Sequence, residues 1–219
     1  MDIDLRLYAL VDPAVAGGRR LADLAGLIAG STTLVQLRDK HGSTRAMVEE
    51  ARSLRGVLEP AGVPLLINDR VDVALAAEAD GVHIGQDDMT PADARLLLGR
   101  TAIIGLSIST VQQAQTAPLE LLDYVGIGAV FATGSKDDAN TPIGPSGLRD
   151  IARAIRARAP NFPICAISGI NAGNAAEVIE AGADGVAVIS ALSLASDPAQ
   201  AAQKLRAVVD DALKRRGKS

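Results

Sequence analysis

The clearest indication of the fold lies in residues 32–69, which read TTLVQLRDKHGSTRAMVEEARSLRGVLEPAGVPLLIND. An apolar run (32–40) is followed by a helical pattern (44–62) and by a second apolar run (63–69). A helix that crosses between neighbouring strands leaves those strands parallel, because the chain returns to the starting edge before the second strand begins. This stretch therefore predicts a strand–helix–strand unit of a parallel sheet.

The same unit recurs along the chain. Strands are expected at 5–11, 32–40, 63–69, 80–86, 101–108, 123–131, 162–170 and 184–190. A helical pattern follows each of them, and eight such pairs predict an α/β fold with a single (β/α)8 TIM barrel. An open doubly wound sheet usually carries a glycine fingerprint after its first strand, which DPAVAGG (12–18) lacks. We expect one domain over residues 1–219, with a basic, solvated tail at about 214–219 whose cations could also complete the C-terminus of a helix.

Composition narrows the class of function. Hydrophobic residues make up 48% of the chain and aromatic residues only 2%, so the core has to be aliphatic, as suits parallel strands covered by helices. Few aromatic rings and a net charge of −4 argue against a nucleic-acid partner. The sequence shows neither a long apolar stretch nor a signal-peptide pattern, so we expect a cytoplasmic protein with no membrane partner. The single Cys165 lies in an apolar run and is expected to be a buried, unreactive thiol.

Polar residues at the ends of the predicted strands indicate where the chemistry lies, since TIM barrels place their reacting groups there. Gln36, Arg38 and Lys40 alternate along residues 32–40 and so share one side of that strand. Two cations and an amide at the barrel mouth favour an anion with several oxygens, such as a phosphate. The alternative is an ordinary solvated strand end.

Carboxylates follow the next two predicted strands. Asn68 and Asp69 close the third strand, and Asp87 and Asp88 follow the fourth. Asp69 and Asp88, beside the two cations of the second strand, fit a Mg²⁺ ion that is bound together with a polyphosphate. Asp87 is expected to be a solvated neighbour. Taken singly, either ligand is equally compatible with capping the helix that follows it.

The later strand ends offer a hydroxyl, a long loop and a small residue. Ser107 ends the fifth strand, although a hydroxyl bonded to backbone is the simpler interpretation of a lone serine. The sixth strand leads into the segment 131–147, with Thr133, Ser135 and Lys136 near its start. Loops of this length often close over active sites, and Lys136 would then reach a phosphate, unless it is a surface lysine. Gly169 lets backbone N–H groups approach a second anion closely.

The histidines contribute less to this picture. His83 lies in mid-strand and is expected to line the barrel or its core rather than bind a metal. His41 lies in a loop, and the sequence has no cysteine–histidine cluster of the kind that binds zinc.

Seven segments together resemble the thiamine phosphate synthase (thiamine-phosphate pyrophosphorylase) family. They are QLRDK (36–40), IND (67–69), GVHIGQDD (81–88), GLSIST (105–110), YVGIGAVFATGSK (124–136), AISGI (166–170) and AGADGVAVIS (181–190). The resemblance implies a transferase that joins 4-amino-2-methyl-5-hydroxymethylpyrimidine diphosphate to a thiazole phosphate, giving thiamine phosphate and pyrophosphate. It implies Mg²⁺ as the cofactor and small-molecule substrates as the partners, and it is compatible with a homo-oligomer.

The resemblance also implies a role for each site residue. Gln36 would bond the pyrimidine, Ser107 would contact the pyrimidine diphosphate, and Asp69 and Asp88 would hold Mg²⁺. The diphosphate would be held by Arg38, Lys40, Asn68 and Lys136. The thiazole phosphate would be contacted by Thr133, Ser135, Gly169, Ile189 and Ser190, the last three through backbone N–H groups. The catalytic residues would be those that stabilise the charge of the leaving group, namely Arg38, Lys40, Lys136 and Ser107.

Three alternatives remain at this point. A thiazole tautomerase on the same barrel would lack the Gln-Asp-Asp ending of the fourth strand and carry a histidine near the end of the fifth, where this chain has SIST (107–110). A non-catalytic phosphate-binding barrel would use Asp69 and Asp88 only as helix caps. A Schiff-base lyase would need a desolvated lysine, which a position in a flexible loop does not favour for Lys136.

Overall fold

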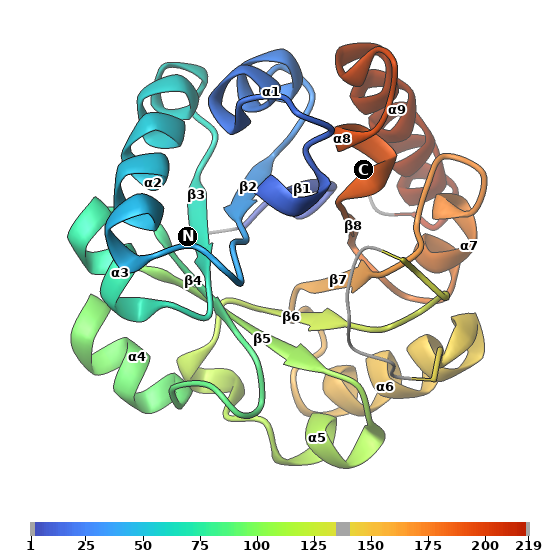
Figure 1. Cartoon of the computed structure of the whole chain (residues 1–219). Helices are drawn as coiled ribbons and strands as arrows, with labels where there is room; N and C mark the ends of the chain where they lie inside the picture. The colour runs from blue at the N-terminus through green and yellow to red at the C-terminus, as the bar shows by residue number, and fades with distance from the viewer. Residues whose placement is uncertain (1–2, 135–140, 218–219) are drawn as a thin grey trace.

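The computed structural model describes residues 3–134 and 141–217, and it has a closed barrel of parallel strands with helices around it (Figure 1). Each strand pairs with the next along the chain, and the last pairs with the first. The strands are β1 (Leu7–Val11), β2 (Leu34–Leu37), β3 (Leu65–Asn68), β4 (Gly81–Ile84), β5 (Ile103–Ile108), β6 (Tyr124–Ile127), β7 (Ile164–Ile167) and β8 (Gly185–Val188). Each lies within the range predicted for it, and the predicted (β/α)8 barrel is confirmed.

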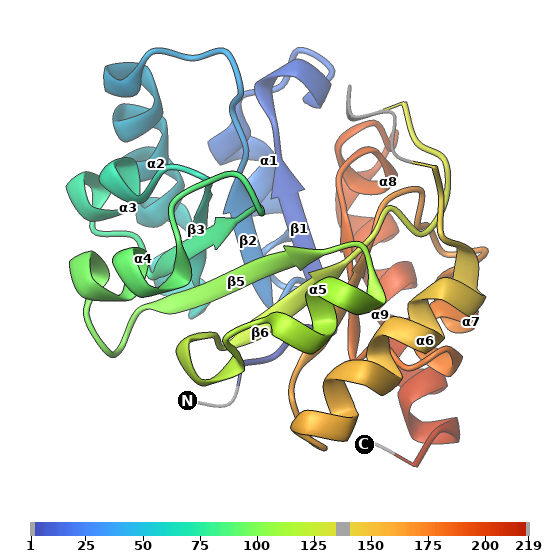
Figure 2. The same cartoon turned by 90° about the horizontal axis from the view of Figure 1, so that it is seen from below.

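The helices form the outer layer of the barrel (Figures 1 and 2). The α-helices are α1 (Leu21–Ile28), α2 (Thr44–Leu58), α3 (Val71–Ala77), α4 (Pro91–Leu98), α5 (Val111–Thr116), α6 (Gly144–Arg158), α7 (Ala175–Glu180), α8 (Ser190–Ser193) and α9 (Pro198–Arg215). Three short 3₁₀ turns are η1 (Pro13–Val15), η2 (Glu59–Ala61) and η3 (Leu119–Leu121). Within the described residues, no helix combines the length and the apolar character that crossing a membrane requires.

The alternation of side chains along each strand divides the core into two parts. One large aliphatic cluster lies between the strands and the helices and includes Val35, Leu37 and Ile67. A smaller cluster contains Tyr8, Leu34, Leu66, Tyr124 and Cys165. Strand residues alternate between the two clusters, so the second one fills the interior of the barrel.

A repeated turn closes the N-terminal ends of the strands. The carboxylates of Asp80 and Asp184 accept hydrogen bonds from the first backbone N–H groups of β3 and β7, at 2.8 and 3.0 Å. Gly81 and Gly185 follow them because a Cβ at either position would overlap the backbone of the adjacent chain segment. The motif Ala-x-Ala-Asp-Gly-Val, which occurs at residues 77–82 and again at 181–186, is therefore a helix-to-strand turn.

Arg216, in the predicted basic tail, is ordered by hydrogen bonds. Helix α9 continues to Arg215, and Arg216 donates hydrogen bonds to the carboxylate of Asp184 and to the carbonyl oxygens of Ile179 and Ala183. Its side chain is only 18% exposed. The expectation of a solvated tail is wrong at Arg216, because a partly buried carboxylate and two carbonyls bind its guanidinium group.

Candidate active site

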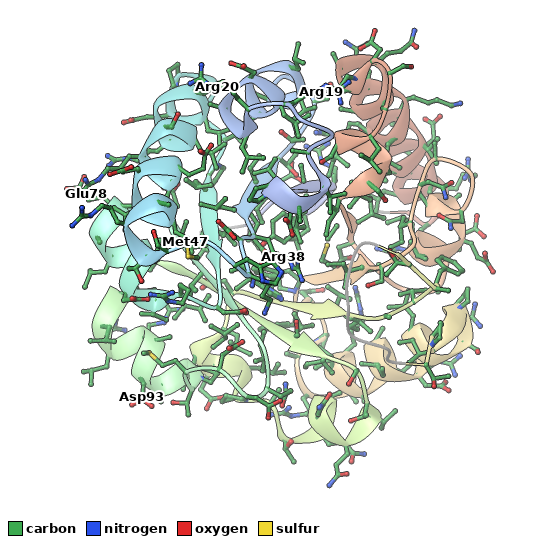
Figure 3. The ribbon with its side chains drawn as sticks, in the orientation of Figure 1. Arg19, Arg20, Arg38, Met47, Glu78 and Asp93 are labelled. Carbon is green, nitrogen blue, oxygen red and sulfur yellow. The ribbon has the colours of Figure 1, made fainter. Side chains whose placement is uncertain are left out.

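A cavity of about 680 Å³ opens at the C-terminal ends of the strands. Arg38 lines this cavity, and in Figure 3 its labelled side chain lies near the centre of the ring of helices. Most residues that the sequence assigns to the pyrimidine diphosphate and its metal line the cavity. They are Gln36, Arg38, Lys40, Asn68, Asp69, Asp88 and Ser107. The tertiary structure therefore gathers side chains from four consecutive strands, β2 to β5, around one space.

Arg38 is held in place by a carboxylate from the neighbouring strand. Its backbone N–H donates to the carbonyl of Val11, and its guanidinium group forms an ion pair with Asp12. The Asp12 side chain is only 2% exposed and also accepts a hydrogen bond from the N–H of Ala14 at 2.9 Å. Because one carboxylate oxygen engages Arg38 and the other the backbone, the orientation of the guanidinium group is fixed at the cavity wall.

Asp69 lies among charges of both signs. Lys40 Nζ is 2.5 Å from its Oδ2 atom, and its own backbone N–H donates to the carbonyl of His83 at 2.8 Å. Burial raises the pKa of the Asp69 carboxyl group, the hydrogen bond and charge of Lys40 lower it, and a side-chain hydrogen bond and the charge of Asp88 raise it again, with a net rise. Asp69 and Asp88 therefore line the same cavity, and Asp88 is one of the groups that raise the pKa of Asp69.

Neither of these aspartates caps a helix. Helix α3 begins after Arg70 without a side-chain cap, and α4 is capped by the hydroxyl of Thr90, which accepts from the N–H of Asp93. Asp88 instead accepts from the N–H of Gly85 at 2.7 Å. Asp69 has φ = 61°, a left-handed conformation that is uncommon for a residue with a side chain and recurs at functional sites. The helix-cap interpretation of Asp69 and Asp88 is wrong.

The floor of the cavity is polar but buried. Gln36 is 1% exposed and donates its amide N–H to the hydroxyl of Tyr8. His83 lies 2.7 Å from the hydroxyl of Tyr124 through Nδ1 and 2.9 Å from the hydroxyl of Ser107 through Nε2. The expectation that His83 lines the barrel is confirmed, and the barrel floor connects the two cavity-lining residues Gln36 and Ser107 through side chains.

A smaller pocket lies beside the main cavity, at the ends of β7 and β8. Gly169 has φ = 67°, and a Cβ there would approach the Ala132 carbonyl oxygen to 2.6 Å. The main cavity shares Thr133, Ile167, Ser168 and Ala187 with this pocket. The residues assigned to the thiazole phosphate that line it are Thr133, Gly169, Ile189 and Ser190. The two predicted anion sites are thus contiguous. Ser135 and Lys136 lie outside the described residues.

Several residues of the site were not predicted. Asp12 directly follows β1, and the argument applied to the later strand ends could have identified it. Gln86 donates its amide N–H to the carbonyl oxygen of Ser107 at 2.6 Å, which ties the end of β4 to that of β5. Tyr8 and Tyr124 lie inside strands, where the sequence pattern gives no sign that their hydroxyl groups meet under the cavity.

Cys165 also lines the cavity, but its thiol is not a candidate nucleophile. The residue is 1% exposed, and burial raises the pKa of the thiol, with a smaller rise from the charge of Asp184. A protonated, desolvated thiol is a poor nucleophile. The expectation of a buried free thiol is confirmed.

Comparison with known proteins agrees with this geometry. Residues 7–192 match the family model described as thiamine monophosphate synthase. The chain is 50% identical over 208 residues to the thiamine-phosphate synthase of Chloroflexus aurantiacus, covering 94% of each chain. It is 49% identical over 207 residues to that of Xanthobacter autotrophicus, covering 94% of this chain and 96% of the relative.

A solved structure shares the fold along nearly the whole chain. It is described as thiamine phosphate pyrophosphorylase from Pyrococcus furiosus, with a TM-score of 0.82 and 36% sequence identity. The match covers 96% of this chain and 98% of the other. The chain therefore belongs to the thiamine monophosphate synthase family.

Proposed function

We propose that this protein joins 4-amino-2-methyl-5-hydroxymethylpyrimidine diphosphate to a thiazole phosphate, releasing thiamine phosphate and pyrophosphate. One observation carries the proposal: a cavity is lined by cations and carboxylates at one end and continues into a glycine-bearing pocket at the other. Two anionic substrates that must react with each other need such a pair of connected sites. Names of the relatives support the same reaction.

The site fits a magnesium ion that is held jointly with a substrate. The described residues contain no group of three or more His, Cys, Asp or Glu side chains that would enclose a metal by themselves. Asp69 and Asp88 supply two interacting carboxylates, and Mg²⁺ typically binds one or two carboxylates while the substrate phosphates and waters complete the octahedron. When bound there, Mg²⁺ would neutralise charge on the departing pyrophosphate.

The side chains around the two carboxylates would hold the diphosphate. Arg38 presents a guanidinium group that Asp12 keeps in one orientation, and such a group binds phosphate oxygens in pairs. Lys40 would move its ammonium group from Asp69 toward the phosphate. Asn68, at the end of β3, would donate its amide N–H groups. The family resemblance assigns Lys136 to the diphosphate as well.

The reaction requires no nucleophile or strong base from the protein. The C–O bond between the pyrimidine methylene and the diphosphate breaks, and its electron pair leaves with pyrophosphate. The amino group of the pyrimidine stabilises the resulting cation. The thiazole nitrogen then forms the new C–N bond to the methylene carbon with its lone pair. This reaction can be catalysed by positioning the two substrates and by stabilising the negative charge of the departing pyrophosphate. The cations of this cavity would supply both effects.

The thiazole phosphate would occupy the smaller pocket. Gly169 leaves room for its backbone to approach the phosphate, and Ile189 and Ser190 would add backbone N–H groups from the end of β8. Thr133 and Ser135 would face the same substrate. Because both substrates carry phosphate groups, which do not cross lipid bilayers, we also propose that the protein acts in the cytoplasm.

Product formation from both substrates, with and without Mg²⁺, tests the proposal. We expect thiamine phosphate and pyrophosphate in equal amounts, and only when the metal is present. Isomerisation of a thiazole substrate without pyrophosphate release would identify a tautomerase, and binding without turnover would identify a phosphate-binding barrel. Asp88→Ala serves as the site control, since it should lower pyrophosphate release sharply while the circular dichroism spectrum remains that of the parent.

A further inference from the structure

We propose that five side chains form a hydrogen-bond relay with one direction: the buried Gln36, Tyr8, Tyr124 and His83, and the partly buried Ser107. In this relay Tyr8, Tyr124 and His83 are positioning residues. They determine that Gln36 presents a hydrogen-bond acceptor to the ligand and that Ser107 presents a donor. The description of the relay rests on geometry alone. Its effect on the pyrimidine diphosphate rests on the proposed function.

The relay is continuous across the barrel. Gln36 Nε2 donates to the Tyr8 hydroxyl, which lies 2.9 Å from the Tyr124 hydroxyl. Tyr124 lies 2.7 Å from His83 Nδ1, and His83 Nε2 lies 2.9 Å from the Ser107 hydroxyl. These are the only two tyrosines in the chain, and they meet although they are 116 residues apart.

Glycines make room for the relay in the barrel wall. Gly105 pairs with His83 on one side and with Tyr124 on the other, so it lies between them at the same level of the sheet. A Cβ at Gly105 would overlap the ring of Tyr124, and one at Gly126 would approach His83 Cε1 to 3.0 Å. Without side chains at these two positions, the rings of His83 and Tyr124 can meet, with their centroids 5.4 Å apart.

The direction follows from counting hydrogens. Either tyrosine could donate between the two hydroxyl groups, and because Tyr8 already accepts from Gln36, we assign its own hydrogen to Tyr124, so that neither phenol hydrogen lacks an acceptor. Tyr124 then gives its hydrogen to His83 Nδ1, which must carry a lone pair. A neutral imidazole with a bare Nδ1 carries its hydrogen on Nε2 and donates it to Ser107. The Ser107 hydroxyl hydrogen remains to be donated into the cavity.

The two ends of the relay therefore present complementary groups. At one end the buried Gln36 Oε1 has no hydrogen-bond partner among the described residues, and it is an acceptor. At the other end Ser107 is a donor. An unsatisfied buried amide oxygen costs about 1–3 kcal/mol, which a ligand N–H would recover. The amino group of an aminopyrimidine is such a donor, whereas an oxygen at the same ring position would face Gln36 Oε1 and be rejected.

Burial keeps the two phenols in the form that the relay needs. Both tyrosines are fully buried, and burial is the main cause that raises the pKa of Tyr8 and of Tyr124. Both hydroxyl groups therefore keep their hydrogen at neutral pH. Hydrogen bonds in a medium of low dielectric also polarise one another, so a change at one member is transmitted to the next.

The tautomer of His83 in the protein without substrates is the first test. The chain has two histidines, and the exposed His41 provides an internal reference for ¹⁵N NMR of labelled protein at about pH 8, where an imidazole with an ordinary pKa of about 6.5 is neutral. We expect hydrogen on Nε2 of His83 and none on Nδ1. Hydrogen on Nδ1 would mean the opposite direction and would overturn the proposal. This result does not depend on turnover, so it separates the relay from the proposed function.

Two matched substitutions form the second test. Tyr124→Phe removes the hydrogen that fixes Nδ1, so we expect a mixture of His83 tautomers and a fall of about tenfold in kcat/KM for the pyrimidine diphosphate. The KM for the thiazole phosphate should not change. Tyr8→Phe leaves Tyr124 bonded to His83, so the tautomer should remain while Gln36 loses its partner. If both variants are merely less stable, with the wild-type ¹⁵N spectrum and kcat/KM, the tyrosines are structural only and the proposal is wrong.

Discussion

The ammonium nitrogen of Lys40 lies 2.5 Å from a carboxylate oxygen of Asp69, a residue that we assign to magnesium binding. Their side chains are 44% and 18% exposed, so the pair lies at the border between the cavity and solvent. Lys40 is also assigned to the diphosphate. One lysine would thus have two partners of the same charge, and the substrate and the carboxylate would compete for it.

Lys40→Met should therefore change metal and substrate binding in opposite directions. Without substrate, Mg²⁺ should bind about threefold more tightly because no ammonium group competes for Asp69, an effect in the range of exposed ion pairs. Binding of the pyrimidine diphosphate should weaken, because the cation is lost. Calorimetry with Mg²⁺ alone and with substrate measures both. Lys214→Met, which removes an exposed lysine paired with Asp211 on α9, is the matched control and should change neither. Weaker Mg²⁺ binding in Lys40→Met would contradict this account.

Asp69→Asn should raise the stability of the metal-free protein at neutral pH while abolishing Mg²⁺-dependent turnover. Burial and the neighbouring Asp88 raise the pKa of Asp69 above its ordinary value of 3.8, against the lowering effect of Lys40. The folded state therefore holds this proton more tightly, and the contribution of Asp69 to the free energy of unfolding falls as pH rises from 3.8 through the raised pKa. Asparagine also tolerates the left-handed backbone at this position.

Chemical unfolding of both proteins across this pH range, without Mg²⁺, measures the effect. The stability advantage of Asp69→Asn should grow with pH and then level off. Asp72→Asn is a control of opposite sign, because the hydrogen bond from Arg70 is the main cause that lowers the pKa of Asp72, and that contribution is lost as pH falls. An advantage of Asp69→Asn that is constant with pH would show that the charge of Asp69 is not the cause.

Asp12→Asn should impair binding of the pyrimidine diphosphate, although residue 12 acts on the substrate only through Arg38. The amide keeps an oxygen for the N–H of Ala14 but removes the charge that pairs with Arg38, which is 11% exposed. Losing one partner of a buried pair costs about 3–5 kcal/mol, with the lower end expected beside an open cavity. We expect a higher KM for the pyrimidine diphosphate, measured by steady-state kinetics. Asp4→Asn breaks the pair with Arg6 outside the cavity and should leave KM unchanged.

Gly169→Ala should weaken binding of the thiazole phosphate. A Cβ there would lie 2.6 Å from both the Ala132 carbonyl oxygen and the Phe131 Cβ, so the segment after β6 has to shift. Gly62→Ala is a matched control, because Gly62 has the same φ of 67° but nothing within 4 Å of the added carbon. Both variants carry a left-handed strain of about 1–2 kcal/mol. Only Gly169→Ala should raise KM for the thiazole phosphate, and equal kinetics in the two variants would remove Gly169 from that site.

The alternation of apolar and helical segments was enough to predict the barrel, because each strand and helix is recognised from residues close together in the chain. The same local periodicity placed Gln36, Arg38 and Lys40 on one side of a strand, and all three line the cavity. A barrel also has one catalytic face, so polar strand ends could be assigned to a common site before any contact was known.

Side-chain contacts between different strands could not be predicted from local periodicity. The sequence left Asp69 and Asp88 equally compatible with helix caps and with metal ligands, and the folded chain shows that Thr90 caps α4 and that both aspartates line one cavity. Tyr8 and Tyr124 gave no signal at all, because their meeting depends on the closure of the barrel and on the register of strands far apart in sequence. Periodicity acts over a few residues, whereas hydrogen bonds across the barrel exist only after all eight strands have closed.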